Sequence, residues 1–162
     1  MSNTTTTRVK VRNAVMTDVL RIQTLVNHYA KTDLMLPKSL NQLYENIRDF
    51  IVLEIEGKVI GCGALHFYWE DLAEVRSLAV DPDCAKRGYG ALIVECLVQQ
   101  AKEYKVNRVF CLTLVPGFFA KLGFKEVPHS ELPQKVYKDC INCVKLGKCD
   151  EIAMVISTEI QE

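Results

Sequence analysis

The segment from Glu74 to Gly90 constrains the fold more than any other part of the chain. It reads as an apolar strand, a short loop, and then Gly88 and Gly90 at the start of a helical pattern. Main-chain N–H groups at the start of a helix have no intrahelical partner and lie at the positive end of the helix dipole. Glycines let a phosphate approach the bare main chain, so this segment predicts an anion site.

The spacing of the two glycines narrows the kind of anion. It matches neither the Gly-x-Gly-x-x-Gly pattern of dinucleotide sites nor a phosphate loop that ends in Gly-Lys-Ser/Thr, so neither ligand class is favoured. After the glycines, Ile93, Leu97, Ala101 and Tyr104 recur at helical spacing and predict a helix over 88–104.

The rest of the chain predicts alternating helices and strands. Strands are expected over 8–13, 50–55, 59–67, 72–80, 109–114 and 151–158, with a hairpin turn at 56–58. Helices are expected over 17–30 with Thr17 as N-cap, over 40–48 with Ser39 as N-cap, and over 118–122 with Gly123 at the end. This order predicts an α/β (α+β) fold, in which helices flank a mixed, mostly antiparallel sheet. We expect one domain over 8–162 and a disordered tail over 1–7.

Composition excludes several partner classes. The formal net charge is zero, so neither nucleic acid nor an anionic membrane is expected as a partner. The first residues are polar and Thr-rich and lack the apolar core of a signal peptide, and no apolar run approaches a membrane span. These features predict a cytoplasmic protein.

Seven cysteines in a chain without a secretion signal predict reduced thiols. Cys62, Cys96 and Cys111 lie in apolar stretches and are expected as small core residues. A second group has the spacing Cys-x-x-Cys-x5-Cys, which suits metal, thiol packing or a redox pair; its members are Cys140, Cys143 and Cys149. A structural zinc site needs four ligands and only His129 is near in sequence, so we predict no metal.

The segment from Glu74 to Gly90 resembles the acetyl-CoA loop of the GCN5-related N-acetyltransferase (GNAT) family. In that family a strand ending in Leu-Ala-Val precedes Asp-Pro and a run Gln/Arg-x-x-Gly-x-Gly/Ala, and only Ala85 departs from this pattern here. A second stretch, Phe118-Phe-Ala-Lys-Leu-Gly-Phe124, is similar to the family's Phe-Tyr-Glu-Lys-Leu-Gly-Phe. The resemblance implies acetyl-CoA as cosubstrate, held by Leu78, Ala79, Val80, Ala85, Lys86, Arg87, Gly88, Tyr89, Gly90, Phe118 and Phe119.

The resemblance also implies catalytic roles. A Glu at the position of Glu74 often acts as general base in the family, directly or through water, and the N–H of Leu78 would polarise the acetyl carbonyl. Strand alternation puts Leu72, Glu74, Arg76 and Leu78 on one face, so Glu74 could instead simply pair with Arg76. The family's acid is usually the Tyr of the Phe-Tyr pair. Phe119 cannot donate a proton, and Thr113 or Tyr137 are candidates to replace it.

Within the family, the chain looks most like the short amino-acid acetyltransferases akin to the catalytic domain of N-acetylglutamate synthase. The segments 35–47, 73–80 and 149–155 carry this likeness. It implies L-glutamate as the acceptor and the first step of arginine synthesis. Two carboxylates need cationic or strong donor groups, for which the candidates are Lys38, Ser39, Arg76 and Lys135.

Other acceptors and assemblies remain open. Glutamine, a peptide N-terminus or a polyamine could replace glutamate, and a non-catalytic CoA-binding domain is also conceivable. The apolar strand near the C-terminus, 152–156, would suit pairing between subunits as well as within one, so a homodimer is expected.

Overall fold

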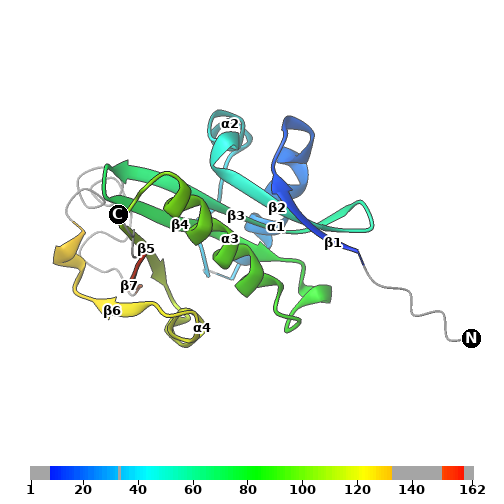
Figure 1. Cartoon of the computed structure of the whole chain (residues 1–162). Coiled ribbons are helices and arrows are strands. Elements are labelled where there is room, and N and C mark those ends of the chain that lie inside the picture. Colours follow the sequence, from blue (N-terminus) through cyan, green and yellow to red (C-terminus); the bar gives the residue numbers. More distant parts are fainter. Residues whose placement is uncertain (1–7, 33, 133–150, 159–162) are drawn as a thin grey trace, which may run out of the picture. The chain divides into compact units, whose positions relative to one another are not determined.

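The structure is a computed structural model that describes residues 8–32, 34–132 and 151–158 (Figure 1). Its strands are β1 (Val9–Asn13), β2 (Phe50–Ile55), β3 (Lys58–Trp69), β4 (Leu72–Val80), β5 (Arg108–Thr113), β6 (Lys125–Val127) and β7 (Ile152–Ser157). Its α-helices are α1 (Val19–Ala30), α2 (Leu40–Glu45), α3 (Tyr89–Glu103) and α4 (Pro116–Lys121). Short 3-10 turns cover Met16–Asp18, Ile47–Asp49, Pro82–Cys84 and His129–Glu131.

The seven strands form one mixed sheet in the order β1-β2-β3-β4-β5-β7-β6. β4 and β5 run parallel, whereas β1 with β2, β2 with β3, β5 with β7 and β6 with β7 run antiparallel. The expected mixed, mostly antiparallel sheet with helices is confirmed. β7 pairs with β5 and β6 within the chain, which is the first of the two kinds of pairing that the sequence allowed for this strand.

The chain divides into two compact units, residues 1–64 with 77–96 and residues 65–76 with 97–162. In the first unit, α1 and α2 bury Val19, Ile22, Val26 and Leu43 against residues of β2 and β3. In the second, the core gathers around Leu72, Phe110, Leu132 and Ala153. Each unit therefore has its own apolar core, which stabilises it by removing that surface from water.

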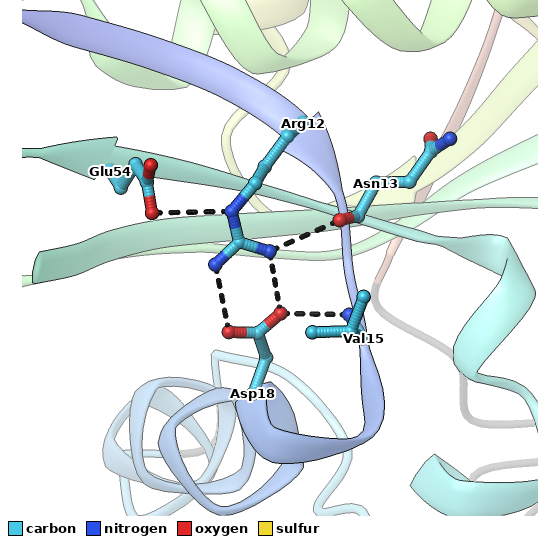
Figure 2. A network of polar contacts seen from close by, with 5 residues as sticks. All are labelled: Arg12, Asn13, Val15, Asp18 and Glu54. Carbon is cyan, nitrogen blue, oxygen red and sulfur yellow. Dashed lines mark hydrogen bonds and ion pairs between the residues drawn. The ribbon is translucent and has the colours of Figure 1, made fainter. Parts of the chain in front are cut away.

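A buried ion pair fixes the start of the first helix (Figure 2). Asp18 is 7% exposed and accepts hydrogen bonds from the Arg12 guanidinium at 2.8 and 3.0 Å and from the Val15 N–H at 2.8 Å. Arg12 also donates to Glu54 at 3.2 Å. The predicted N-cap at Thr17 is wrong, because residues 16–18 form a 3-10 turn and the α-helix begins only at Val19.

Two irregularities mark the central strands. The β2–β3 register shifts between Leu53 and Glu54, opposite the segment that contains Gly61. In β4, Ser77 has a φ of 55°, which interrupts the extended main chain. The predicted alternation of Leu72, Glu74, Arg76 and Leu78 assumes a continuous extended chain, and Ser77 interrupts that chain between Arg76 and Leu78.

Two large apolar residues on or next to the helices are exposed. Tyr104 follows the end of α3 and is 70% exposed, and Leu20 on α1 is 61% exposed. Ile93, Leu97 and Ala101 are buried as expected. Within the described ranges, no helix combines the length and the apolar character needed to cross a membrane.

Candidate active site

The loop after β4 presents bare main chain, as the glycine pattern predicted. Gly88 has a φ of 82° and Lys86 a φ of 62°, so the chain turns twice through the left-handed region before α3 begins at Tyr89. A Cβ built on Gly88 would have no heavy atom within 4 Å. Glycine is thus required here by conformation and leaves open space, which fits a phosphate approaching the first N–H groups of α3.

The predicted loop residues differ in exposure. Ala85, Lys86, Arg87 and Gly88 are exposed, whereas Tyr89 and Gly90 are half-buried. The two cationic side chains therefore stand beside the helix start, where they can complement an anion. On the strand before the loop, Leu78 and Val80 are half-buried and Ala79 is part of the core of the first unit.

Side chains of α1 hold the end of β4. Tyr29 donates from its hydroxyl to the main-chain carbonyl of Val80. Arg21 pairs with Asp81 at 2.6 Å, and Asp81 also accepts from the Asp83 N–H at 3.0 Å. The pKa of Asp81 is lowered, first by that N–H and then by Arg21. These contacts fix the direction in which the chain enters the loop.

Glu74 is a buried carboxylate on β4 that contacts Tyr68 and Arg76. It is 3% exposed, and its Oε1 accepts a hydrogen bond from the Tyr68 hydroxyl at 3.3 Å. Arg76 Nη1 lies 3.8 Å from the same oxygen and donates to the Tyr68 hydroxyl at 3.3 Å. A carboxylate taken out of water at this depth is costly unless it is hydrogen-bonded or paired, and here it is both.

The surroundings of Glu74 come from neighbouring strands. Glu74 is the register partner of Phe110 on β5, and the Phe110 ring lies 5.7 Å from the Tyr68 ring. The next residue on β5 is Cys111, whose pKa is raised mainly by burial and further by the negative charge of Glu74. Glu74 thus has apolar Phe110 as its register partner on β5 and polar contacts with Tyr68 and Arg76.

Thr113, the candidate acid, and the second family motif over 118–124 are held by local contacts. Thr113 is buried, and its Oγ1 accepts a hydrogen bond from the Val115 N–H at 2.9 Å, which fixes the start of α4. Phe119 is buried and packs edge-on against Phe118 at 5.0 Å and against Phe124 at 5.2 Å. Phe118 is half-buried. Because Thr113 uses a lone pair in this turn, its hydroxyl proton remains chemically able to donate.

The predicted substrate residues are partly described. Ser39 caps α2, accepting from the Gln42 N–H, as predicted. The Lys38 main chain is held by α1, since its N–H donates to Asn27 Oδ1 at 3.2 Å and its carbonyl accepts from Gln23 Nε2 at 3.3 Å. Lys38 is half-buried and Ser39 is exposed. Lys135 and Tyr137 lie outside the described residues.

Only some of the cysteines for which a role was predicted lie within the described residues. Cys62 and Cys111 are buried, as expected, whereas Cys96 is half-buried. Cys140, Cys143 and Cys149 lie outside the described residues. His129 forms a 2.8 Å hydrogen bond through Nε2 with the Glu151 carbonyl. In the part of the chain that the structure describes, no three His, Cys, Asp or Glu side chains gather as metal ligands would.

Sequence reasoning missed three of the residues that position the site. Tyr68 was not singled out and lies just beyond the strand predicted over 59–67, although its hydroxyl donates to Glu74. Arg21 was not singled out, and Tyr29 counted only as one position of the helix predicted over 17–30. Their roles depend on which strand and helix neighbours they meet, which local patterns do not encode; a paired reading of the two hairpin strands could have suggested Tyr68.

Comparison with known proteins agrees with this geometry. The chain is 46% identical over 145 residues to an uncharacterised N-acetyltransferase of Chlorobaculum tepidum, covering 90% of this chain and 94% of that one. It is 41% identical over 143 residues to an amino-acid acetyltransferase of Mycobacterium tuberculosis, covering 86% and 82%.

Among solved structures, the N-acetylglutamate synthase of Neisseria gonorrhoeae, complexed with coenzyme A and N-acetyl-glutamate, superposes with a TM-score of 0.82. The identity is 25%, and the match covers 96% of this chain and 36% of that one. Residues 16–124 match the family described as the acetyltransferase (GNAT) family. The chain therefore belongs to the GNAT family of acetyltransferases.

Proposed function

We propose that the chain transfers the acetyl group of acetyl-CoA to the α-amino group of a free amino acid, with L-glutamate as the preferred acceptor. This reaction is the first step of arginine biosynthesis. The observation that carries the proposal is the buried Glu74 carboxylate, on the same strand that leads into the exposed glycine loop. The named activities of the relatives from Mycobacterium tuberculosis and Neisseria gonorrhoeae support the acceptor class.

The loop would hold the diphosphate of CoA. The N–H groups at the start of α3 follow the exposed Gly88, and Lys86 and Arg87 supply positive charge beside them. Ala85 lacks the side-chain donor usual at its position, which leaves main-chain donors to carry the contact. Leu78 and Val80, half-buried on β4, would contact the pantetheine arm through the main chain.

Glu74 would act on the incoming amine. An α-amino group is mostly protonated at neutral pH, so it must lose a proton before or during its attack on the thioester carbonyl. In the proposed reaction the amine nitrogen bonds to the acetyl carbon, its proton passes to Glu74 directly or through water, and the C–S bond breaks to release CoA as thiolate. The Leu78 N–H would stabilise the oxyanion formed on the carbonyl oxygen.

The candidate acceptor-binding residues are cationic groups or strong donors. Arg76 lies beside Glu74, and its guanidinium carries five N–H donors, so the contact through Nη1 is compatible with binding a carboxylate. Lys38 and Ser39 precede α2 and would supply a positive charge and a helix-start N–H. Lys in place of Arg at position 38 lacks a bidentate fork, which leaves glutamine as the main competing acceptor.

A panel of amines tests the acceptor. Thiol release from acetyl-CoA would be measured with L-glutamate, L-glutamine, a polyamine and a peptide N-terminus. The proposal predicts turnover with glutamate well above the others. Faster turnover with glutamine, a polyamine or a peptide would reassign the acceptor, and CoA binding without release for any amine would indicate a non-catalytic CoA-binding domain.

A lysine variant tests the pocket. Lys38→Met is expected to raise the KM for glutamate about tenfold, since it removes one charge-assisted contact, and to leave the KM for acetyl-CoA unchanged. The matched control is Lys102→Met, at an exposed position on α3. Equal kinetics for Lys38→Met and wild type would remove Lys38 from the proposed site.

A further inference from the structure

We infer that Tyr68 is a positioning residue of the acetyl transfer, because its hydroxyl orients the Glu74 carboxylate and stabilises the ionised form of that carboxylate. The inference rests on the proposed function of Glu74 as the base. It adds a residue from β3, a strand that carries none of the family motifs.

The hydroxyl lies between a group that only accepts and a group that only donates. Tyr68 Oη is 3.3 Å from Glu74 Oε1 and 3.3 Å from Arg76 Nη1. An ionised carboxylate carries no proton, and a guanidinium has no lone pair to offer. In this geometry the phenol proton is donated to Glu74 and the phenol oxygen accepts from Arg76. This arrangement makes Tyr68 a fixed donor to the carboxylate.

The ring of Tyr68 is held by contacts that do not involve its hydroxyl. It meets the His66 ring at 4.9 Å with an interplanar angle of 73°, and the Phe110 ring at 5.7 Å with an angle of 47°. It also packs against the core of the second unit around Leu72. Replacing Tyr68 by Phe thus removes one oxygen atom and keeps the ring contacts.

The hydroxyl has two effects on a base. It restricts rotation of the carboxylate, which keeps the accepting oxygen in a productive direction. It also stabilises the negative charge, because a hydrogen bond donated to the charged form favours that form. Tyr68 keeps its own proton throughout the reaction; the amine proton passes only to Glu74.

Other groups around Glu74 can also shape a pH profile. Arg76 lies beside it on β4, and His66 contacts the Tyr68 ring on β3. The charge of Glu74 also helps to raise the pKa of Cys111 on β5. The charge of Glu151 also acts on Cys111. A Glu74 variant is therefore needed to identify which limb of the profile belongs to the base.

The test compares kcat/KM against pH for wild type, Tyr68→Phe, Glu74→Gln and Tyr104→Phe. The acceptor is the amine that gives the fastest thiol release in the panel. Tyr104 is the matched control, because it is an exposed tyrosine whose ring contacts Phe67 at 5.0 Å in the same unit. Thermal unfolding confirms that each variant is folded.

We expect Glu74→Gln to lose the acid limb. In Tyr68→Phe that limb should move upward by about half to one pH unit, with kcat at the optimum lowered about tenfold. The KM for acetyl-CoA and the profile of Tyr104→Phe should stay as in wild type.

The possible outcomes distinguish the positioning role of Tyr68 from the role of Glu74 as the base. A lost limb in Glu74→Gln with an unshifted limb in Tyr68→Phe overturns the role of Tyr68 and leaves the proposed base in place. A fully active Glu74→Gln overturns the base itself, and the role of Tyr68 with it. A shifted limb in Tyr104→Phe as well would also overturn the inference, since the shift would then not report the contact with Glu74.

Discussion

The hydroxyl of Tyr29 on α1 donates a hydrogen bond to the main-chain carbonyl of Val80, the last residue of β4. Burial raises the pKa of Tyr29, and the nearby charge of Asp81 raises it further, so the hydroxyl stays a donor at neutral pH. A helix side chain thereby holds the strand end that leads into the glycine loop. The loop's position depends on α1 as well as on the sheet.

Removal of this hydroxyl should loosen the end of β4. Tyr29→Phe is expected to lower the free energy of unfolding by about 1 kcal/mol and to raise the Kd for CoA about threefold. Chemical denaturation and titration calorimetry measure the two effects. Tyr44→Phe, at an exposed position on α2, should change neither, and an unchanged Kd in Tyr29→Phe would contradict the link between α1 and the loop.

CoA binding at the glycine loop can be tested by comparing Gly88 with Gly57, a glycine of the β2–β3 turn that has the same main-chain conformation. Gly88 and Gly57 have φ values of 82° and 81°, and neither has a heavy atom within 4 Å of a built Cβ. Alanine should therefore cost about 1 kcal/mol of stability at either position through main-chain strain. Only Gly88→Ala should also weaken CoA binding, about fivefold to tenfold by calorimetry. Equal CoA affinity in both variants would place the diphosphate elsewhere.

Thiol labelling reports on the same loop. Burial raises the pKa of Cys62 to about 12, so its thiolate is scarce at pH 8 and its reaction with iodoacetamide should be very slow. Cys84 is half-buried just before the loop and should react faster. Added CoA should slow the labelling of Cys84 and leave Cys62 unchanged, as peptide mass spectrometry can show. Labelling of Cys84 that ignores saturating CoA would argue against binding at this loop.

Much of the fold was predictable where a local pattern decides the structure. The strands 50–55 and 72–80 were predicted to the residue, since each is an apolar run bounded by turn signals. The hairpin between β2 and β3 also matched, with Glu56 and Gly57 both in the left-handed region. The glycine loop was found because its chemistry depends on the main chain, which a motif specifies.

The remainder depended on tertiary contacts. β6 has three residues with largely exposed side chains and is defined by its pairing with β7, so no local pattern marks it. Thr17 could cap a helix, but the pair of Arg12 with Asp18 favours a 3-10 turn there instead. The contact of Tyr68 with Glu74 needs the arrangement of two strands, and the interruption at Ser77 gives no sequence signal of its own.

The Arg12–Asp18 pair should make stability depend on pH. The pKa of Asp18 lies below its ordinary value of 3.8, mainly because Arg12 donates to the carboxylate. Its contribution is therefore complete above about pH 4 and is lost as the pH falls through the folded-state pKa. Asp18→Asn should lower the free energy of unfolding by about 2 kcal/mol at pH 7, and this difference should shrink below pH 4.

Denaturation curves from pH 3 to pH 7 measure that difference. Glu126→Gln, an amide substitution at an exposed position of β6, should track wild type across the range. A difference between Asp18→Asn and wild type that stays constant down to pH 3 would show that the ion pair is not its source.

The base assignment is tested most directly by the rate of N-acetylglutamate formation from acetyl-CoA and L-glutamate. Glu74→Gln keeps the size of the side chain and should lower kcat about a hundredfold or more, because the amine loses its proton acceptor. The Kd for CoA should not change, and Glu126→Gln should have the kinetics of wild type. General base catalysis typically contributes about a hundredfold or more to the rate. A kcat of Glu74→Gln within about twofold of the wild-type value would therefore contradict the account.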